Sequence, residues 1–141
     1  MIMSLIIGID YGLKRIGIAY AETPLFIAHP LATIRNNELF SYLTDYNKNK
    51  TIKKIIIGEP KSLDGRSTDI TEIVRQLKKK LENNFPKIDV VLYDERFTSK
   101  IAMQSMVIGG VKKKERRKKG NIDEISAVII LQDYLMKNKG L

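Results

Sequence analysis

Acidic residues follow apolar runs at three separate places in this sequence. Asp10, Glu59 and the pair Asp94 and Glu95 each stand at the end of a short run rich in isoleucine or valine. Such runs are typical of strands buried on both faces. If these strands are parallel neighbours, their carboxyl ends meet at one edge of the sheet, where open sheets bind ligands. The sequence therefore predicts several carboxylates at a single edge.

Carboxylates that converge in this way need a cation. Without one they repel, and one of them would have to stay protonated. Mg²⁺ takes oxygen ligands, usually one or two carboxylates together with waters and substrate phosphate oxygens. Two such ions about 3.5–4 Å apart activate the attacking water and stabilise the leaving oxygen in phosphodiester cleavage. We therefore expect two Mg²⁺ (or Mn²⁺) ions and a phosphodiester substrate.

Composition narrows the remaining chemistry. The chain has no cysteine, which excludes disulfides and thiolate chemistry, and it has one histidine. That residue, His29, lies in a run that reads as an edge strand ended by Pro30, so we do not expect it to be catalytic. Asp123 falls in the first turn of a predicted helix, where the helix dipole alone would favour a carboxylate.

The chain is strongly basic, with a formal net charge of +9 and a pI of about 9.7. A basic surface indicates nucleic acid first, and anionic lipid or acidic partners second. Lysines 78–80 read as a solvated helix face. Cations near the acids are the candidate nucleic-acid-binding residues: Lys14, Arg15, Arg96, Lys112, Lys113, Lys114, Arg116, Arg117, Lys118 and Lys119. Arg96 could instead pair with Asp94 or Glu59.

The length of 141 residues suits one domain. No apolar run approaches the roughly 20 residues that span a bilayer, and the N-terminus lacks the features of a signal peptide. We therefore expect a cytoplasmic protein with no membrane partner.

The predicted order of elements is three strands followed by alternating helices and strands. We expect strands at 5–10, 16–20, 25–34, 55–57 and 90–93, and helices at 38–46, 67–83, 98–108 and from Asn121 to 137. Asn36 or Asn37 could cap the first helix, and Asn121 with Glu124 has the spacing of a capping box in the last. The first two strands form a hairpin with Gly12 in its turn. Right-handed crossovers make the fourth and fifth strands parallel to the first.

Four segments, GIDYGLKRIGIAYA, IIIGEPKSLDG, YDERFTS and IDEISAVIILQDYL, resemble the YqgF/RuvX family in order and spacing. The resemblance covers nearly the whole chain. It implies an α/β ribonuclease H-like fold over residues 1–141, with a five-stranded mixed sheet (order 3-2-1-4-5) flanked by helices on both faces. Members are small bacterial proteins related to Holliday-junction resolvases, and are also described as nucleases that mature the 5′ end of 16S ribosomal RNA precursor.

The resemblance also implies roles for individual residues. Asp10, Glu95 and Asp123 become the catalytic and metal-binding set, with Glu95 either a ligand or the residue that orients the attacking water. Asp94 would support them by hydrogen bonding. Glu59 departs from the family, which usually has leucine there. It is either a fourth ligand or an exposed replacement for that leucine, and the sequence favours the replacement.

Three functions follow from this reading. The first is a metal-dependent endonuclease, either for 5′-end processing of pre-16S rRNA or for Holliday junctions. Junction cleavage would need two active sites and therefore a symmetric dimer. The second is a nucleic-acid-binding module without turnover. The third is a nucleotide phosphotransferase, because the first hairpin resembles the phosphate-binding hairpin of actin-like kinases. We do not favour it, since those enzymes need two such domains to hold ATP and this chain has length for one.

Overall fold

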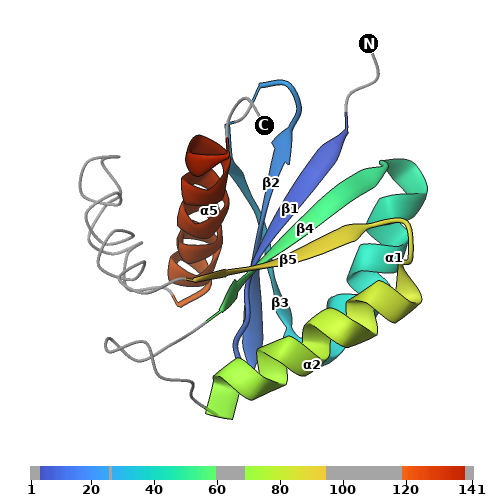
Figure 1. Cartoon of the computed structure of the whole chain (residues 1–141). Helices are drawn as coiled ribbons and strands as arrows, with labels where there is room; N and C mark the ends of the chain where they lie inside the picture. Colours follow the sequence, from blue (N-terminus) through green and yellow to red (C-terminus); the bar gives the residue numbers. More distant parts are fainter. Residues whose placement is uncertain (1–3, 26, 60–68, 95–118, 139–141) are drawn as a thin grey trace.

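Five strands form one mixed sheet in the order β3-β2-β1-β4-β5 (Figure 1). The computed structural model describes residues 4–25, 27–59, 69–94 and 119–138, apart from the side chains of residues 69 and 119–123. β1 pairs antiparallel with β2 and parallel with β4, and β5 is parallel to β4. This topology is the predicted one. The strands are β1 (Leu5–Asp10), β2 (Arg15–Glu22), β3 (His29–Arg35), β4 (Ile52–Glu59) and β5 (Asp89–Asp94).

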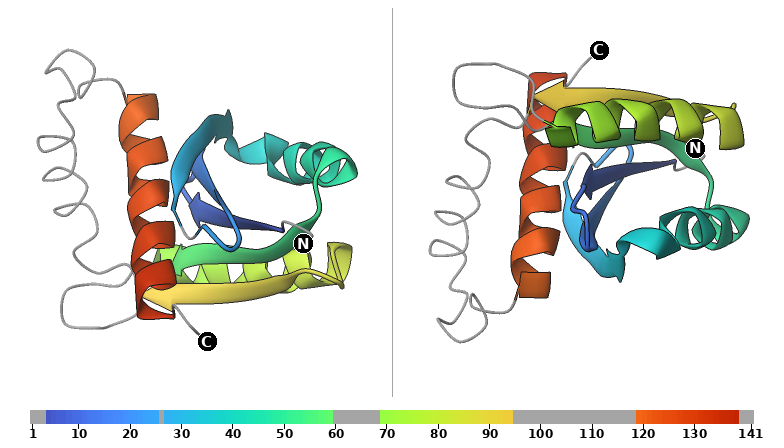
Figure 2. Two further views of the ribbon diagram at one scale, coloured as in Figure 1. Left: turned by 90° about the horizontal axis from the view of Figure 1, so that it is seen from above. Right: turned by 90° about the horizontal axis from the view of Figure 1, so that it is seen from below.

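Helices cover both faces of the sheet, as expected. α1 (Leu39–Asn49), which follows the short helix η1 (Asn36–Glu38), and α2 (Asp69–Asn84) lie on one face, and α5 (Lys119–Lys137) lies on the other (Figure 2). The core has a corresponding division into two buried clusters, one on each side of the sheet. In the described part of the chain, no helix has both the length and the apolar character needed to cross a bilayer.

The central strand β1 supplies side chains to both clusters. Ile7 and Ile9 belong to the cluster under α1 and α2, whereas Ile6 belongs to the cluster under α5. Successive side chains of a strand point to opposite faces. This alternation explains why the run is apolar throughout, and it places Gly8 on the α5 face.

Gly8 lets α5 approach the sheet closely. A Cβ atom built on Gly8 would lie 2.7 Å from the Cβ of Leu131 and 3.1 Å from the carbonyl oxygen of Ala127. Carbon atoms in good contact are about 3.5–4.0 Å apart, so no larger residue fits without moving the helix. The absence of a side chain at Gly8 therefore sets the separation between β1 and α5.

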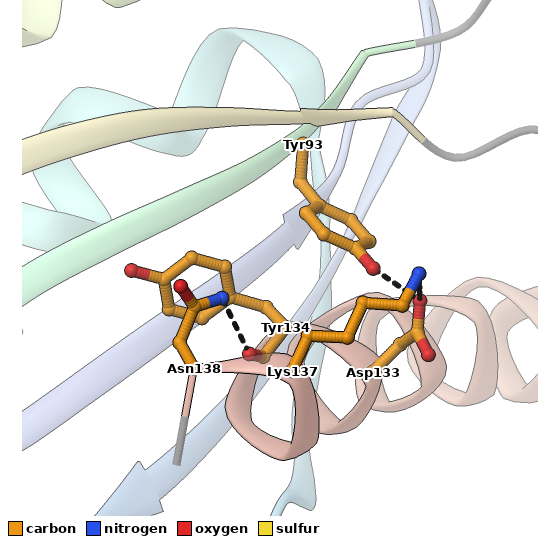
Figure 3. A network of polar contacts seen from close by, with 5 residues as sticks. All are labelled: Tyr93, Asp133, Tyr134, Lys137 and Asn138. Carbon is orange, nitrogen blue, oxygen red and sulfur yellow. Dashed lines mark hydrogen bonds and ion pairs between the residues drawn. The ribbon is translucent and has the colours of Figure 1, made fainter. Parts of the chain in front are cut away.

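The last turns of α5 are tied to β4 and β5 by polar contacts, and Figure 3 shows those that involve Tyr93 of β5. The hydroxyl of Tyr93 donates to a carboxylate oxygen of Asp133, which also lies 3.2 Å from the Nζ atom of Lys137. Lys54 Nζ donates to the hydroxyl of Tyr134 over 3.0 Å. Burial, and secondarily the bond with Asp133, raises the pKa of Tyr93. These contacts fix the position of α5 along the sheet.

The structure corrects several predicted boundaries. β3 begins at His29 rather than at Leu25, and Pro30 lies within it instead of ending it. This is tolerated because β3 is an edge strand and Pro30 lies at a shift in register with β2. α1 extends beyond the predicted helix, to Asn49. The predicted helix at 98–108 lies outside the described residues.

Two predicted helix caps are also wrong. No side-chain cap bond is present at the start of η1 or of α1, and the amide of Asn36 is used elsewhere. α5 begins at Lys119, so Asn121 lies inside the helix rather than at its start. This start of the helix removes the capping box expected for Asn121 and Glu124.

Candidate active site

Asp10 is the last residue of β1 and is half-buried at the carboxyl edge of the sheet. It is the register partner of Gly17 on β2, and Gly17 is the partner of Thr33 on β3. The alternation along β1, with Ile7 and Ile9 toward α1 and α2, places Asp10 on the face that α5 covers. Asp10, Gly17 and Thr33 therefore form a row across the sheet beneath α5.

α5 runs in the opposite direction to β1. Ile6 and Leu135 belong to the same cluster and line the same pocket, whereas a Cβ on Gly8 would meet Leu131 and the carbonyl of Ala127. A step of two residues along β1, from Ile6 to Gly8, thus corresponds to one or two turns toward the N-terminus of α5, from Leu135 to Leu131 and Ala127. One further step of two residues leads from Gly8 to Asp10 and brings the strand to the turn around residue 123.

A hydrogen bond on the same row supports this register. Thr33 Oγ1 donates to Oε1 of Glu124 over 3.2 Å, so the first turns of α5 lie over the row that contains Asp10. The backbone of Asp123, the residue before Glu124, belongs to that part of the helix. The partnership of Asp10 and Asp123 stays a prediction, because the side chain of Asp123 lies outside those that the structure describes.

Glu124 is a residue of this region that the sequence reasoning interpreted differently. Its spacing from Asn121 indicated a capping box, a role internal to the helix. The structure instead directs its carboxylate to Thr33 on the edge strand. The signal that could have revealed this is its place next to Asp123, at the same end of an amphipathic helix.

Glu59 and Asp94 end the neighbouring strands β4 and β5 and are direct register partners. Glu59 is only 8% exposed, so the expectation of an exposed replacement for leucine was wrong. Its Oε2 atom lies 3.0 Å from Nε of Arg75 on α2. Arg75 is half-buried in this ion pair. Glu59 thus points to the α2 face, away from the face that carries Asp10, which argues against a fourth ligand.

The turn that follows Asp10 is held by Asn36. The side-chain amide of Asn36 donates to the carbonyl of Gly12 over 2.8 Å, and its backbone N–H donates to the carbonyl of Lys14 over 3.0 Å. A Cβ on Gly12 would lie 2.4 Å from the carbonyl oxygen of Arg15, so only glycine suits this compact turn. The turn is therefore fastened to the end of β3.

Cations lie beside Asp10 on this turn. Lys14 is exposed and Arg15 is half-buried at the start of β2. Lys119 is the first residue of α5, and its side chain is not described. The other predicted site residues lie outside the described residues: Glu95, Arg96, Lys112, Lys113, Lys114, Arg116, Arg117 and Lys118.

The donor chemistry of this edge fits a hard metal ion. Asp10 is the last residue of the central strand β1, and carboxylate oxygens such as those of its side chain are ligands that Mg²⁺ prefers. Among the side chains that the structure describes, no three acidic, histidine or cysteine residues gather closely enough to hold a metal. The two other predicted ligands, Glu95 and Asp123, contribute no described side chain.

Comparison with known proteins identifies the relatives of this chain. It is 44% identical over 135 residues to a protein of Flavobacterium psychrophilum, covering 96% of this chain and 98% of that protein. It is 43% identical to one of Christiangramia forsetii, covering 94% and 98%. Both are named "putative pre-16S rRNA nuclease".

A solved structure has the same fold. T. thermophilus RuvC in complex with a Holliday junction substrate aligns with a TM-score of 0.62 and 14% identity, over 97% of this chain and 96% of RuvC. That similarity establishes a ribonuclease H-like fold. The family model described as "RuvX: Holliday junction resolvase" matches residues 4–137. On the strength of this match and of the two relatives, the chain belongs to the RuvX (YqgF) family.

Proposed function

We propose that this protein is a divalent-metal-dependent endonuclease that hydrolyses phosphodiester bonds during maturation of the 5′ end of pre-16S rRNA. The observation that carries the proposal is the position of Asp10 at the carboxyl end of the central strand, facing the first turns of α5. The names of the relatives support the choice of substrate. The proposed location is the cytoplasm, where a ribosomal RNA precursor would be met.

Asp10, Glu95 and Asp123 form the proposed catalytic and metal-binding set. Asp10 comes from the central strand and Asp123 from the helix packed on it, so the separation of β1 and α5 sets the distance between these residues. Glu95 follows β5 directly in sequence. Bound Mg²⁺ would supply an activated water and stabilise the leaving oxygen.

The cations of the turn would hold the substrate strand. Lys14 and Arg15 follow Asp10 within a few residues, on a turn that Asn36 fastens to β3. Side chains on a fixed turn lose little conformational freedom when they bind a phosphate. The proposed role of these residues is therefore to position the strand whose phosphodiester lies at Asp10.

A comparison of substrates tests this function. The purified full chain would be incubated with an RNA that contains the 5′ precursor segment and start of 16S rRNA, and separately with a four-way DNA junction. Each reaction would be run with Mg²⁺, with Mn²⁺ and with EDTA. We expect cleavage of the RNA that requires a metal ion and is abolished by EDTA.

The outcomes separate the competing functions. Cleavage of the junction but not of the RNA would replace the proposed substrate with branched DNA, and a dimer in solution would then be expected. Binding of both nucleic acids without cleavage of either under any metal condition would indicate a binding module. Cleavage that persists in EDTA would contradict the metal-dependent chemistry itself.

A further inference from the structure

We propose that Arg35, at the end of the edge strand β3, binds a backbone phosphate of the nucleic-acid substrate beyond the cleavage site, together with Lys14 and Arg15. This inference extends the proposed function to a surface on β3 that the sequence did not single out. It assigns Arg35 to a cluster, hereafter the edge cluster, that consists of Lys14, Arg15 and Arg35.

The first observation is a pair of like charges. Arg15 and Arg35 are direct register partners on β2 and β3. Cross-strand partners have Cβ atoms about 4.5–5.5 Å apart, and like charges placed opposite each other destabilise a sheet. Arg35 Nε lies 4.0 Å from Oε1 of Glu38, and the Arg35 side chain is 83% exposed. An exposed ion pair at that distance contributes little. Two guanidinium groups at this spacing can donate hydrogen bonds to the oxygens of one phosphate.

The second observation is a cleft that these residues share. An open cleft of about 560 Å³ is lined by all three cations of the edge cluster. The other lining residues are Leu13, Asn36 and Asn37, so no carboxylate lines the cleft among the residues that the structure describes. Arginine and asparagine side chains and backbone N–H groups are the usual donors to phosphate oxygens. The cleft thus combines positive charge with neutral hydrogen-bond donors.

The third observation is the location of the edge cluster relative to Asp10. Arg15 and Arg35 stand two residues from Gly17 and Thr33, so alternation places them on the same face as the row that contains Asp10. With strands about 4.8 Å apart and about 3.3 Å per residue, the Cα atoms of Arg35 and Asp10 are roughly 12 Å apart.

That distance matches a short stretch of nucleic acid. One strand of a duplex carries a phosphate for every ~3.4 Å of helix axis, so roughly 12 Å corresponds to about three or four phosphates. A strand whose scissile phosphate lies at Asp10 could therefore reach Arg35 within a few nucleotides. Asn36 keeps this geometry constant, because it fastens the turn bearing Lys14 to the strand end bearing Arg35.

The test compares Arg35→Gln with a matched control, Lys48→Gln. Lys48 is also an exposed cation with an acid three residues away, its Nζ lying 3.7 Å from Asp45. It belongs to the last turn of α1, which leads into the amino end of β4, whereas Asp10 and Arg35 lie at the carboxyl ends of their strands. Both substitutions remove one positive charge. Binding would be measured by fluorescence anisotropy in EDTA between 50 and 300 mM KCl, approximate limits set by the range over which counterion release is measurable.

Two labelled probes would be used, the pre-16S RNA and the four-way DNA junction. Each phosphate contact contributes a log–log salt slope of about 0.7 for single strands and 0.9 for duplex, equivalent to roughly fivefold to eightfold in affinity at 0.1 M salt. We expect Arg35→Gln to weaken binding by about that factor and to lower the slope by about one contact. Arg35→Lys should retain the slope, and Lys48→Gln should match the wild type.

Equal behaviour of Arg35→Gln and Lys48→Gln on a probe that the wild type binds would overturn the inference while leaving the nuclease function intact. Conversely, a wild-type protein that binds but does not cleave would contradict the nuclease function, and the loss at Arg35 would still support the edge cluster. A wild-type protein that binds neither probe would contradict both proposals. Circular dichroism would verify that each variant is folded.

Discussion

Gly8 links the packing of the fold to the geometry of the proposed site. In the variant Gly8→Ala, the new Cβ would lie 2.7 Å from the Cβ of Leu131. Restoring ordinary carbon–carbon contact of about 3.7 Å requires α5 and β1 to separate by roughly 1 Å. α5 carries Asp123 and β1 carries Asp10, so the same displacement would separate the two proposed metal ligands.

The expected effects can be estimated for stability and for rate. Overpacking a core costs about 1–3 kcal/mol, which corresponds to a fall in Tm of roughly 3–10 °C for a chain of this size. A misplacement of about 1 Å in an active site can cost on the order of 100-fold in rate. We therefore expect Gly8→Ala to remain folded at assay temperature but to cleave the RNA about 10- to 100-fold more slowly.

A matched variant separates misplacement from general destabilisation. Val74→Ile adds a methylene group to the fully buried cluster under α2, on the face of the sheet away from α5. It should lower the Tm by a comparable amount with little change in cleavage. RNA binding in EDTA should change little in either variant, because the edge cluster lies on β2, on β3 and on the turn between β1 and β2, away from the contact of Gly8 with α5. Wild-type cleavage by Gly8→Ala, or an equal loss in Val74→Ile, would refute the link between the β1–α5 separation and catalysis.

Two further predictions concern residues outside the proposed metal site. Glu59→Leu removes the ion pair with Arg75, whose side chain can stay hydrated because it is 42% exposed. We expect the free energy of unfolding to change by no more than about 1 kcal/mol and RNA cleavage to be unchanged. A loss of cleavage would return Glu59 to the set of metal ligands. The pKa of Tyr93 is raised in the folded protein above its ordinary value of 10.0. The resulting contribution to stability is fully present below pH 10.0 and is lost as the pH rises through the raised pKa. Urea unfolding between pH 8 and pH 11, limits chosen around the ordinary tyrosine pKa of about 10, should therefore show less alkaline loss of stability in Tyr93→Phe than in the wild type, and equal losses would contradict the assignment.

The sheet could be predicted because its signals are local. The runs ending at Asp10, Glu59 and Asp94 are apolar enough to require burial on both faces, and right-handed crossovers make these strands parallel. Their order in the sheet was implied by the resemblance to the RuvX family. The convergence of the strand ends at one edge follows from this order without further information. The register of Glu59 opposite Asp94 confirms that these strand ends are neighbours.

The roles of individual polar side chains could not be predicted in the same way. Glu59 and Asp10 both end buried strands, but their side chains point to opposite faces of the sheet. The last side chain of β4 points toward α2, whereas the last side chain of β1 points to the face that α5 covers. Asn36 can equally cap a helix or bind a turn, and only the proximity of β3 to the first hairpin decides in favour of the carbonyl of Gly12. Such choices depend on contacts between segments distant in sequence.

In the proposed mechanism, the carboxylate of Asp10 at the end of β1 holds a metal ion that promotes RNA cleavage. The most direct test of this role is the Mg²⁺-dependent cleavage rate of pre-16S RNA by Asp10→Asn, measured beside Asp45→Asn, the same chemical change at an exposed position of α1. We predict that Asp10→Asn loses cleavage while keeping its fold and its RNA binding, and that Asp45→Asn cleaves as the wild type does. Unchanged Mg²⁺-dependent cleavage by Asp10→Asn would contradict the account.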